Sequence, residues 1–152
     1  MDPTKKELYT AKRSSGVDTS DPKILEMWER LKDDHDPIQW LLIGYTSPSS
    51  VALIQSGERF DEMLSHMNDD ECFFGALRGK VSGADKFFSL SFVGENVNGM
   101  KKGKASMHKS AVLNLFEVHA SIALSGHCEA NPIVATQQIS QQFRVSPDLV
   151  EL

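Results

Sequence analysis

The side chains able to do chemistry in this sequence are five histidines, two cysteines and two short acidic runs. None of the histidines belongs to an H-x₃-H, H-E-x-x-H or C-x-x-C pattern of the kind that holds zinc. The acidic runs, at 33–36 and 69–71, lack the ligand spacing of a calcium loop. Cys72 lies in an apolar run, which predicts a buried and unreactive thiol. These residues therefore predict no metal site.

Motifs that catalyse reactions or bind nucleotides are absent from the sequence. There is no G-x-S-x-G elbow, no phosphate-binding loop of the Walker type, and no G-x-G-x-x-G after an expected strand. The segment 94–99 begins and ends with glycine, but no Lys-Ser or Lys-Thr pair follows it to hold phosphate. Two cysteines are too few for a disulfide framework, which indicates reduced thiols in the cytosol. The sequence thus predicts a protein that is not an enzyme and has no cofactor.

The positive charge is concentrated in one quarter of the chain. The 152 residues carry a net charge of −5, yet the window 75–112 holds seven basic residues and two acidic ones. Proteins that coat nucleic acid usually present a broad basic face, so an acidic chain with one basic quarter is a poor match. A local basic patch fits an acidic protein partner or an anionic lipid headgroup better.

The apolar pattern predicts the elements that position this basic quarter. Helices are expected at 21–32, 58–67, 104–118 and 131–143, and strands at 38–45, 50–55, 72–77, 86–93 and 119–124. This order predicts an α/β (α+β) fold with a central five- to six-stranded mixed sheet and helices on both faces. We expect one domain at 21–144, with a flexible tail at 1–20 and another tail at 145–152.

The third helix and the loop before it hold four of the seven basic residues of the window 75–112. In 104–118, Met107 falls on the apolar stripe and is expected in the core, whereas Lys104 and Lys109 should face solvent. The preceding segment, 94–103, is expected to be a loop that ends in a basic cluster.

A family resemblance follows from the segment 86–99, KFFSLSFVGENVNG. It resembles the coactosin pattern of the ADF/cofilin-homology family, K-F-x-x-x-x-W/F-x-G-E-N-V-x-G, in which a lysine-led strand leads through a basic loop to a lysine-bearing helix. The lysines at 101–104 continue the match, and Leu31 to Asp34 followed by Trp40 resembles the family's first helix end and first strand. The resemblance covers roughly residues 21–143.

The resemblance implies a gelsolin-like fold and a monomer that binds the side of actin filaments without severing them. It also implies a cytoplasmic protein of the cytoskeleton that binds neither nucleic acid nor a cofactor. The implied principal actin contact is Lys86, at the head of its strand. The other implied actin-binding residues are Lys101, Lys102, Lys104, Lys109, Met100, Arg78 and Lys80.

Two other functions stay open at this point. The first is a severing and monomer-binding protein of the ADF/cofilin type, against which the G-E-N-V segment argues. The second is a module that binds anionic lipids such as phosphoinositides, since each basic residue near an anionic surface contributes about 1 kcal/mol. Actin co-sedimentation and vesicle pelleting at two salt concentrations would separate these functions.

Overall fold

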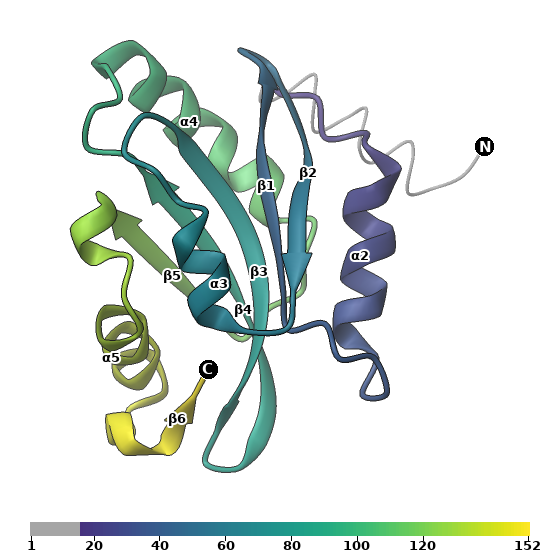
Figure 1. Cartoon of the computed structure of the whole chain (residues 1–152), viewed down its shortest axis with the longest axis vertical. Coiled ribbons are helices and arrows are strands. Elements are labelled where there is room, and N and C mark those ends of the chain that lie inside the picture. Colours follow the sequence, from purple (N-terminus) through teal and green to yellow (C-terminus); the bar gives the residue numbers. More distant parts are fainter. Residues whose placement is uncertain (1–15) are drawn as a thin grey trace.

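The computed structural model describes residues 16–152, which form one mixed sheet between two layers of helices (Figure 1). The strand order is β2-β1-β3-β4-β5, with β6 paired to β3, and only the β4–β5 pair is parallel. The elements are α2 (Pro22–Lys32), β1 (Trp40–Ser47), β2 (Ser50–Gly57), α3 (Phe60–Ser65), β3 (Cys72–Val81), β4 (Ala84–Val93), α4 (Gly99–Leu113), β5 (Ala120–Ser125), α5 (Pro132–Phe143) and β6 (Val150–Glu151). The predicted mixed sheet of five to six strands is confirmed, and it has six.

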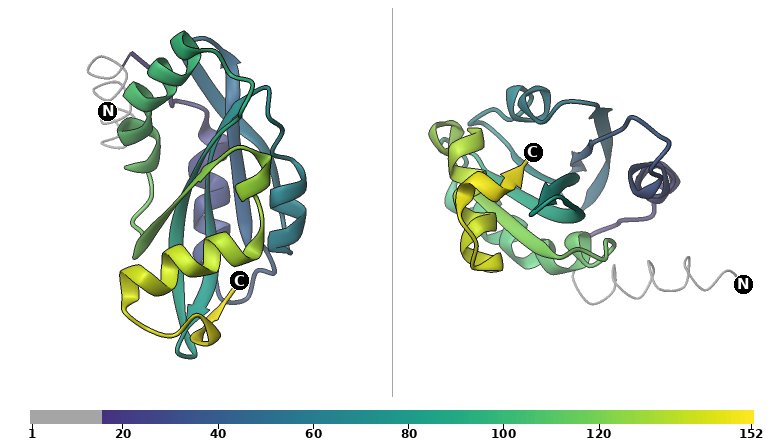
Figure 2. Two further views of the ribbon diagram at one scale, coloured as in Figure 1. Left: turned by 90° about the vertical axis from the view of Figure 1, so that its left-hand side faces the viewer. Right: turned by 90° about the horizontal axis from the view of Figure 1, so that it is seen from below.

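Strand β1 shows why the sheet is covered on both sides. Successive side chains of a strand point to opposite faces. Leu41 and Ile43 pack in the core under α2 and α4, whereas Trp40 and Leu42 pack in the core under α3 and α5. Seen along the sheet, α3 and α4 lie on opposite sides of it (Figure 2). No helix within residues 16–152 is long and apolar enough to cross a membrane.

Helix α2 begins where the sequence predicts, and its first residues also fasten it to the sheet. Asp21 caps the helix by accepting a hydrogen bond from the Lys23 amide at 3.1 Å, and Pro22 takes the first helical position. The other oxygen of the Asp21 carboxylate accepts a hydrogen bond from the Leu53 amide of β2 at 3.0 Å. One carboxylate therefore fixes both the start of α2 and its place beside the sheet.

Parts of both predicted tails pack against the domain. Val17 is fully buried, and Asp18 exchanges main-chain hydrogen bonds with the start of β2, including one from the Val51 amide at 3.1 Å. At the other end, Val150 is buried and β6 pairs with the end of β3. A single buried valine near each end, Val17 and Val150, was not expected in the core from the apolar pattern of the sequence. The rest of the predicted N-terminal tail, residues 1–15, lies outside the described residues.

Candidate functional site

The basic cluster predicted in a loop lies instead in the first turns of α4. Asn98 caps this helix by accepting a hydrogen bond from the Lys101 amide at 2.9 Å, so the helix begins at Gly99 rather than at residue 104. Lys101, Lys102 and Lys104 are exposed, and the first turn has no acidic residue. Cations at a helix N-terminus oppose the helix dipole. These lysines therefore do not stabilise α4. Their presence at the start of the helix favours a role in binding.

The apolar part of the exposed face of α4 consists of two methionines. Met100 is 75% exposed and Met107 is 62% exposed, and their spacing of seven places them on one side of the helix. The prediction that Met107 lies in the core is wrong. The buried residues of α4 are Ala105, His108 and Val112, a stripe that includes a small and a polar side chain and is therefore weak in the sequence.

A groove of about 490 Å³ adjoins the start of α4. Its walls are the β1–β2 turn, the start of β3 and the first turns of α4. The lining includes Met100, Lys101 and Lys104 on one side and Asp70 and Glu71 on another. The lining of the groove therefore combines basic side chains, acidic side chains and a methionine. No pattern in the sequence indicates this groove, because the three segments that line it are far apart along the chain.

Cys72 also lines this groove. The sequence predicted that its thiol is buried and unreactive. Its side chain is buried, and burial raises the pKa of the thiol despite lowering effects from Lys101 and Lys102. A thiol with a raised pKa is a poor nucleophile at neutral pH, so the prediction is confirmed.

The G-E-N-V segment holds the start of α4 in place. The Asp69 carboxylate accepts hydrogen bonds from the amides of Glu95 at 3.2 Å and His127 at 2.6 Å, and its main-chain oxygen accepts one from the Asn96 amide at 2.8 Å. Gly94 lies so close to this loop that an added Cβ would be 2.7 Å from the Glu71 carbonyl oxygen. The glycine and the tight loop therefore have a structural role in positioning α4.

The second basic site is the hairpin of β3 and β4. Ser82 and Gly83 have positive φ angles of 51° and 81°, so the strands are joined by a two-residue turn rather than by the longer loop that the sequence predicted. Lys80 is exposed and Lys86 is half-buried. Their side chains leave the hairpin on opposite faces, since Lys86 shares a face with Phe88, which faces the core under α5, and Lys80 does not.

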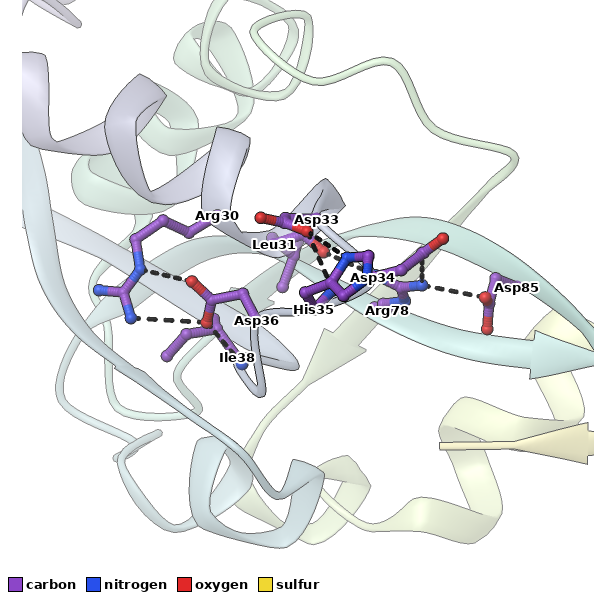
Figure 3. A network of polar contacts seen from close by, with 9 residues as sticks. All are labelled: Arg30, Leu31, Asp33, Asp34, His35, Asp36, Ile38, Arg78 and Asp85. Carbon is purple, nitrogen blue, oxygen red and sulfur yellow. Dashed lines mark hydrogen bonds and ion pairs between the residues drawn. The ribbon is translucent and has the colours of Figure 1, made fainter.

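Arg78, predicted as an actin contact, is buried and bound to acidic residues (Figure 3). Its side chain is 8% exposed and donates hydrogen bonds to Asp34, to Asp85 at 2.9 Å and to the Leu31 carbonyl oxygen at 3.3 Å. Burial lowers the pKa of Arg78, but the two carboxylates outweigh it, so the net shift is upward. The guanidinium carbon lies over the Phe87 ring, 5.6 Å from its centre. This arrangement leaves Arg78 little surface for a partner protein.

The acidic run at 33–36 provides partners for arginines. Asp34 binds Arg78, and Asp36 accepts a hydrogen bond from Arg30 at 2.8 Å (Figure 3). Within residues 16–152, no group of three His, Cys, Asp or Glu side chains is arranged to hold a metal ion.

The two basic sites lie at opposite ends of the sheet. Lys86 is near the start of β4, and the loop to α4 follows the other end of that strand at Val93. A strand rises about 3.3 Å per residue, which separates Lys86 from that end by roughly 20 Å. Figure 1 shows the hairpin of β3 and β4 at the bottom of the molecule and the start of α4 at the top. Lys109, later in α4, is half-buried.

Comparison with known proteins places this arrangement in a family. Residues 16–138 match the family described as Cofilin/tropomyosin-type actin-binding protein. Coactosin from Dictyostelium discoideum is 28% identical over 119 residues, which cover 70% of this chain and 81% of that protein. The drebrin-like protein of Mus musculus is 24% identical over 125 residues, which cover 79% of this chain and 29% of that protein. The chain thus spans less than a third of the length of this longer relative.

Solved structures agree on the fold. Coactosin from Entamoeba histolytica superimposes with a TM-score of 0.73 at 19% identity, covering 86% of this chain and 99% of that one. Mouse coactosin, described as an actin filament binding protein, superimposes with a TM-score of 0.65 at 17% identity, covering 78% and 87%. These likenesses confirm the predicted ADF/cofilin-homology fold.

Proposed function

The chain belongs to the cofilin/tropomyosin-type actin-binding protein family, and we propose that it binds the side of actin filaments without severing them. The observation that supports this most is the presence of two exposed basic sites at opposite ends of one sheet. A filament repeats the same subunit surface along its length. Two distant sites on one small domain can therefore contact two neighbouring subunits of a filament. A single actin monomer has no neighbouring subunit for the second site. The protein would then act on the cytoplasmic actin cytoskeleton.

The two sites make different kinds of contact. At the start of α4, Met100 and Met107 provide apolar area, and exposed lysines surround it. At the hairpin, Lys80 and Lys86 provide charge. Charges at the edge of an interface increase the association rate and fix the register more than they increase affinity. Arg78 is left out of the proposed contact set because it is buried.

High-speed co-sedimentation with filamentous actin tests the proposal. The native protein should pellet without raising the soluble actin. Lys86→Ala should weaken binding roughly threefold to tenfold, because it removes one contact charge from the hairpin. Lys23→Ala, which removes an exposed lysine of α2, an element that belongs to neither basic site, should bind like the native protein. Native protein that stays in the supernatant would refute the proposal, and a rise in soluble actin would favour the severing alternative.

Lipid binding has its own test, because the exposed lysines of α4 suit anionic headgroups too. Vesicles containing phosphoinositides, pelleted at low and physiological salt, should retain less protein at the higher salt if the attachment is electrostatic. A variant with Lys101, Lys102 and Lys104 all changed to Ala should lose it. Vesicle binding by native protein that fails to pellet with actin would replace the filament proposal with the lipid one.

A further inference from the structure

The register of the β3–β4 hairpin gives the Asp85 carboxylate two possible basic partners. Lys80 has two direct cross-strand neighbours, Asp85 of β4 and Glu151 of β6, and Arg78 is the diagonal neighbour of Asp85 on the same face. Side chains directly opposite each other are about 5 Å apart at Cβ, and diagonal ones about 7 Å. Distance alone therefore favours an ion pair between Asp85 and Lys80.

The carboxylate nevertheless binds Arg78. An Oδ atom of Asp85 accepts a hydrogen bond from Arg78 Nη2 at 2.9 Å, and within residues 16–152 neither Lys80 nor Lys86 forms an ion pair. The reason lies in the surroundings of the two cations. Arg78 is 8% exposed and packs on Phe87, whereas Lys80 is exposed and hydrated. A desolvated guanidinium attracts a carboxylate more strongly than a hydrated ammonium does.

We propose that Arg78 is a positioning residue for filament binding: it holds the Asp85 carboxylate and so keeps Lys80 free to contact actin. The inference rests on the proposed function. Without Arg78, Asp85 would turn to its cross-strand neighbour, and that ion pair would have to break each time the protein binds. Arg78 thus acts on the binding surface without being part of it.

Asp34 provides a matched control for Asp85. Arg78 Nη2 also binds this carboxylate, which lies in the loop after α2 and has 75% of its side chain exposed. Asp34 is not in register with Lys80, so its release should leave the lysine free. Neutralising Asp85 or Asp34 changes the net charge equally, and only the first removes the competing partner.

The test measures actin affinity for Arg78→Met and its combinations by co-sedimentation at physiological salt. Arg78→Met should bind about threefold to fivefold more weakly than native protein, the effect of one exposed ion pair. Adding Asp85→Asn should restore native affinity, whereas adding Asp34→Asn should not. In the Lys80→Ala background, Arg78→Met should have no further effect, because both changes remove the same free cation.

Several outcomes would overturn the inference. Equal rescue by Asp85→Asn and Asp34→Asn would mean that net charge alone matters. No rescue by either, with an unchanged near-ultraviolet spectrum, would mean that Arg78 itself contacts actin.

Asp85→Asn in the native background keeps the inference testable if Arg78→Met does not fold. Its affinity should stay within about twofold of native, because Arg78 already holds this carboxylate away from the lysine. A severalfold gain would show that Asp85 masks Lys80 despite Arg78, and would refute the inference. Failure of the native protein to bind filaments would instead refute the proposed function.

Discussion

His108 is the buried titratable side chain of α4, and it is neutral for a physical reason. It is 2% exposed, and its Nδ1 atom lies 2.8 Å from the Tyr45 hydroxyl of β1. Burial and, to a smaller extent, the positive charge of Lys104 lower the pKa of His108. Burial, with a smaller effect of Cys72, raises the pKa of Tyr45. The two rings therefore share a hydrogen bond between neutral groups.

The free energy of unfolding should fall as the pH drops below about 6.5, the usual pKa of histidine in an unfolded chain. There the unfolded chain binds a proton at His108 that the folded chain resists, and the loss is at most about 1.4 kcal/mol per pH unit. His108→Gln removes this titration, so urea unfolding at about pH 7.5 and about pH 5.5 should differ less than in native protein. Equal differences in native protein and His108→Gln would contradict the prediction.

Single residues also show which site assignments the sequence could support. Lys101, Lys102 and Lys104 are exposed as implied, because lysines in a local excess of positive charge rarely find internal partners. Arg78 could not be distinguished from them by type. Its burial depends on Asp34, forty-four positions away, and on a hairpin turn shorter than expected.

The loop before α4 makes a prediction at the scale of an element. Gly94→Ala should destabilise the protein by roughly 1–3 kcal/mol, because the new Cβ would collide with main-chain atoms of Asp69 and Glu71. Gly103→Ala is the matched control, since this glycine lies inside α4 with nothing within 4 Å of an added Cβ. It should stabilise the protein by about 0.5–1 kcal/mol. Thermal unfolding should shift in opposite directions, and shifts of the same sign would contradict this account.

The start of helix α4 is an element boundary that could not be predicted from the sequence. Two glycines and two lysines at 99–103 interrupt any apolar period, so the apolar pattern begins only at 104. What starts the helix is the Asn98 cap, held by a loop that Asp69 ties down from another part of the chain. The other helices and strands that the sequence predicted have continuous apolar stripes and lie within a few residues of their predicted positions, whereas the two-residue strand β6 was not predicted.

At the scale of the whole described domain, both outer strands of the sheet are bonded along their outer edges by other segments, β2 over its first half and β5 along its length. Along β2, Asp18 pairs with the start of the strand and the Asp21 carboxylate binds the Leu53 amide. Along β5, two glutamines of α5 take the place of a neighbouring strand. The Gln138 amide group bonds both the N–H and the C=O of Ala123, each at 2.8 Å, and the Gln142 amide group does the same at Ser121, at 3.0 and 2.6 Å. An outer strand with free N–H and C=O groups is a template for self-association.

Covered outer strands predict a monomer, and the glutamines make that prediction testable. The double variant Gln138→Ala/Gln142→Ala opens the β5 edge, so it should self-associate as concentration rises and lose roughly 1–3 kcal/mol of stability. The control, Gln137→Ala/Gln141→Ala, alters two exposed glutamines of the same helix and should remain monomeric. Light scattering across a concentration series measures both. If the first variant stays as monomeric and as stable as the second, the glutamines do not protect the edge of β5. Water would then satisfy the exposed N–H and C=O groups of the strand at no cost in free energy.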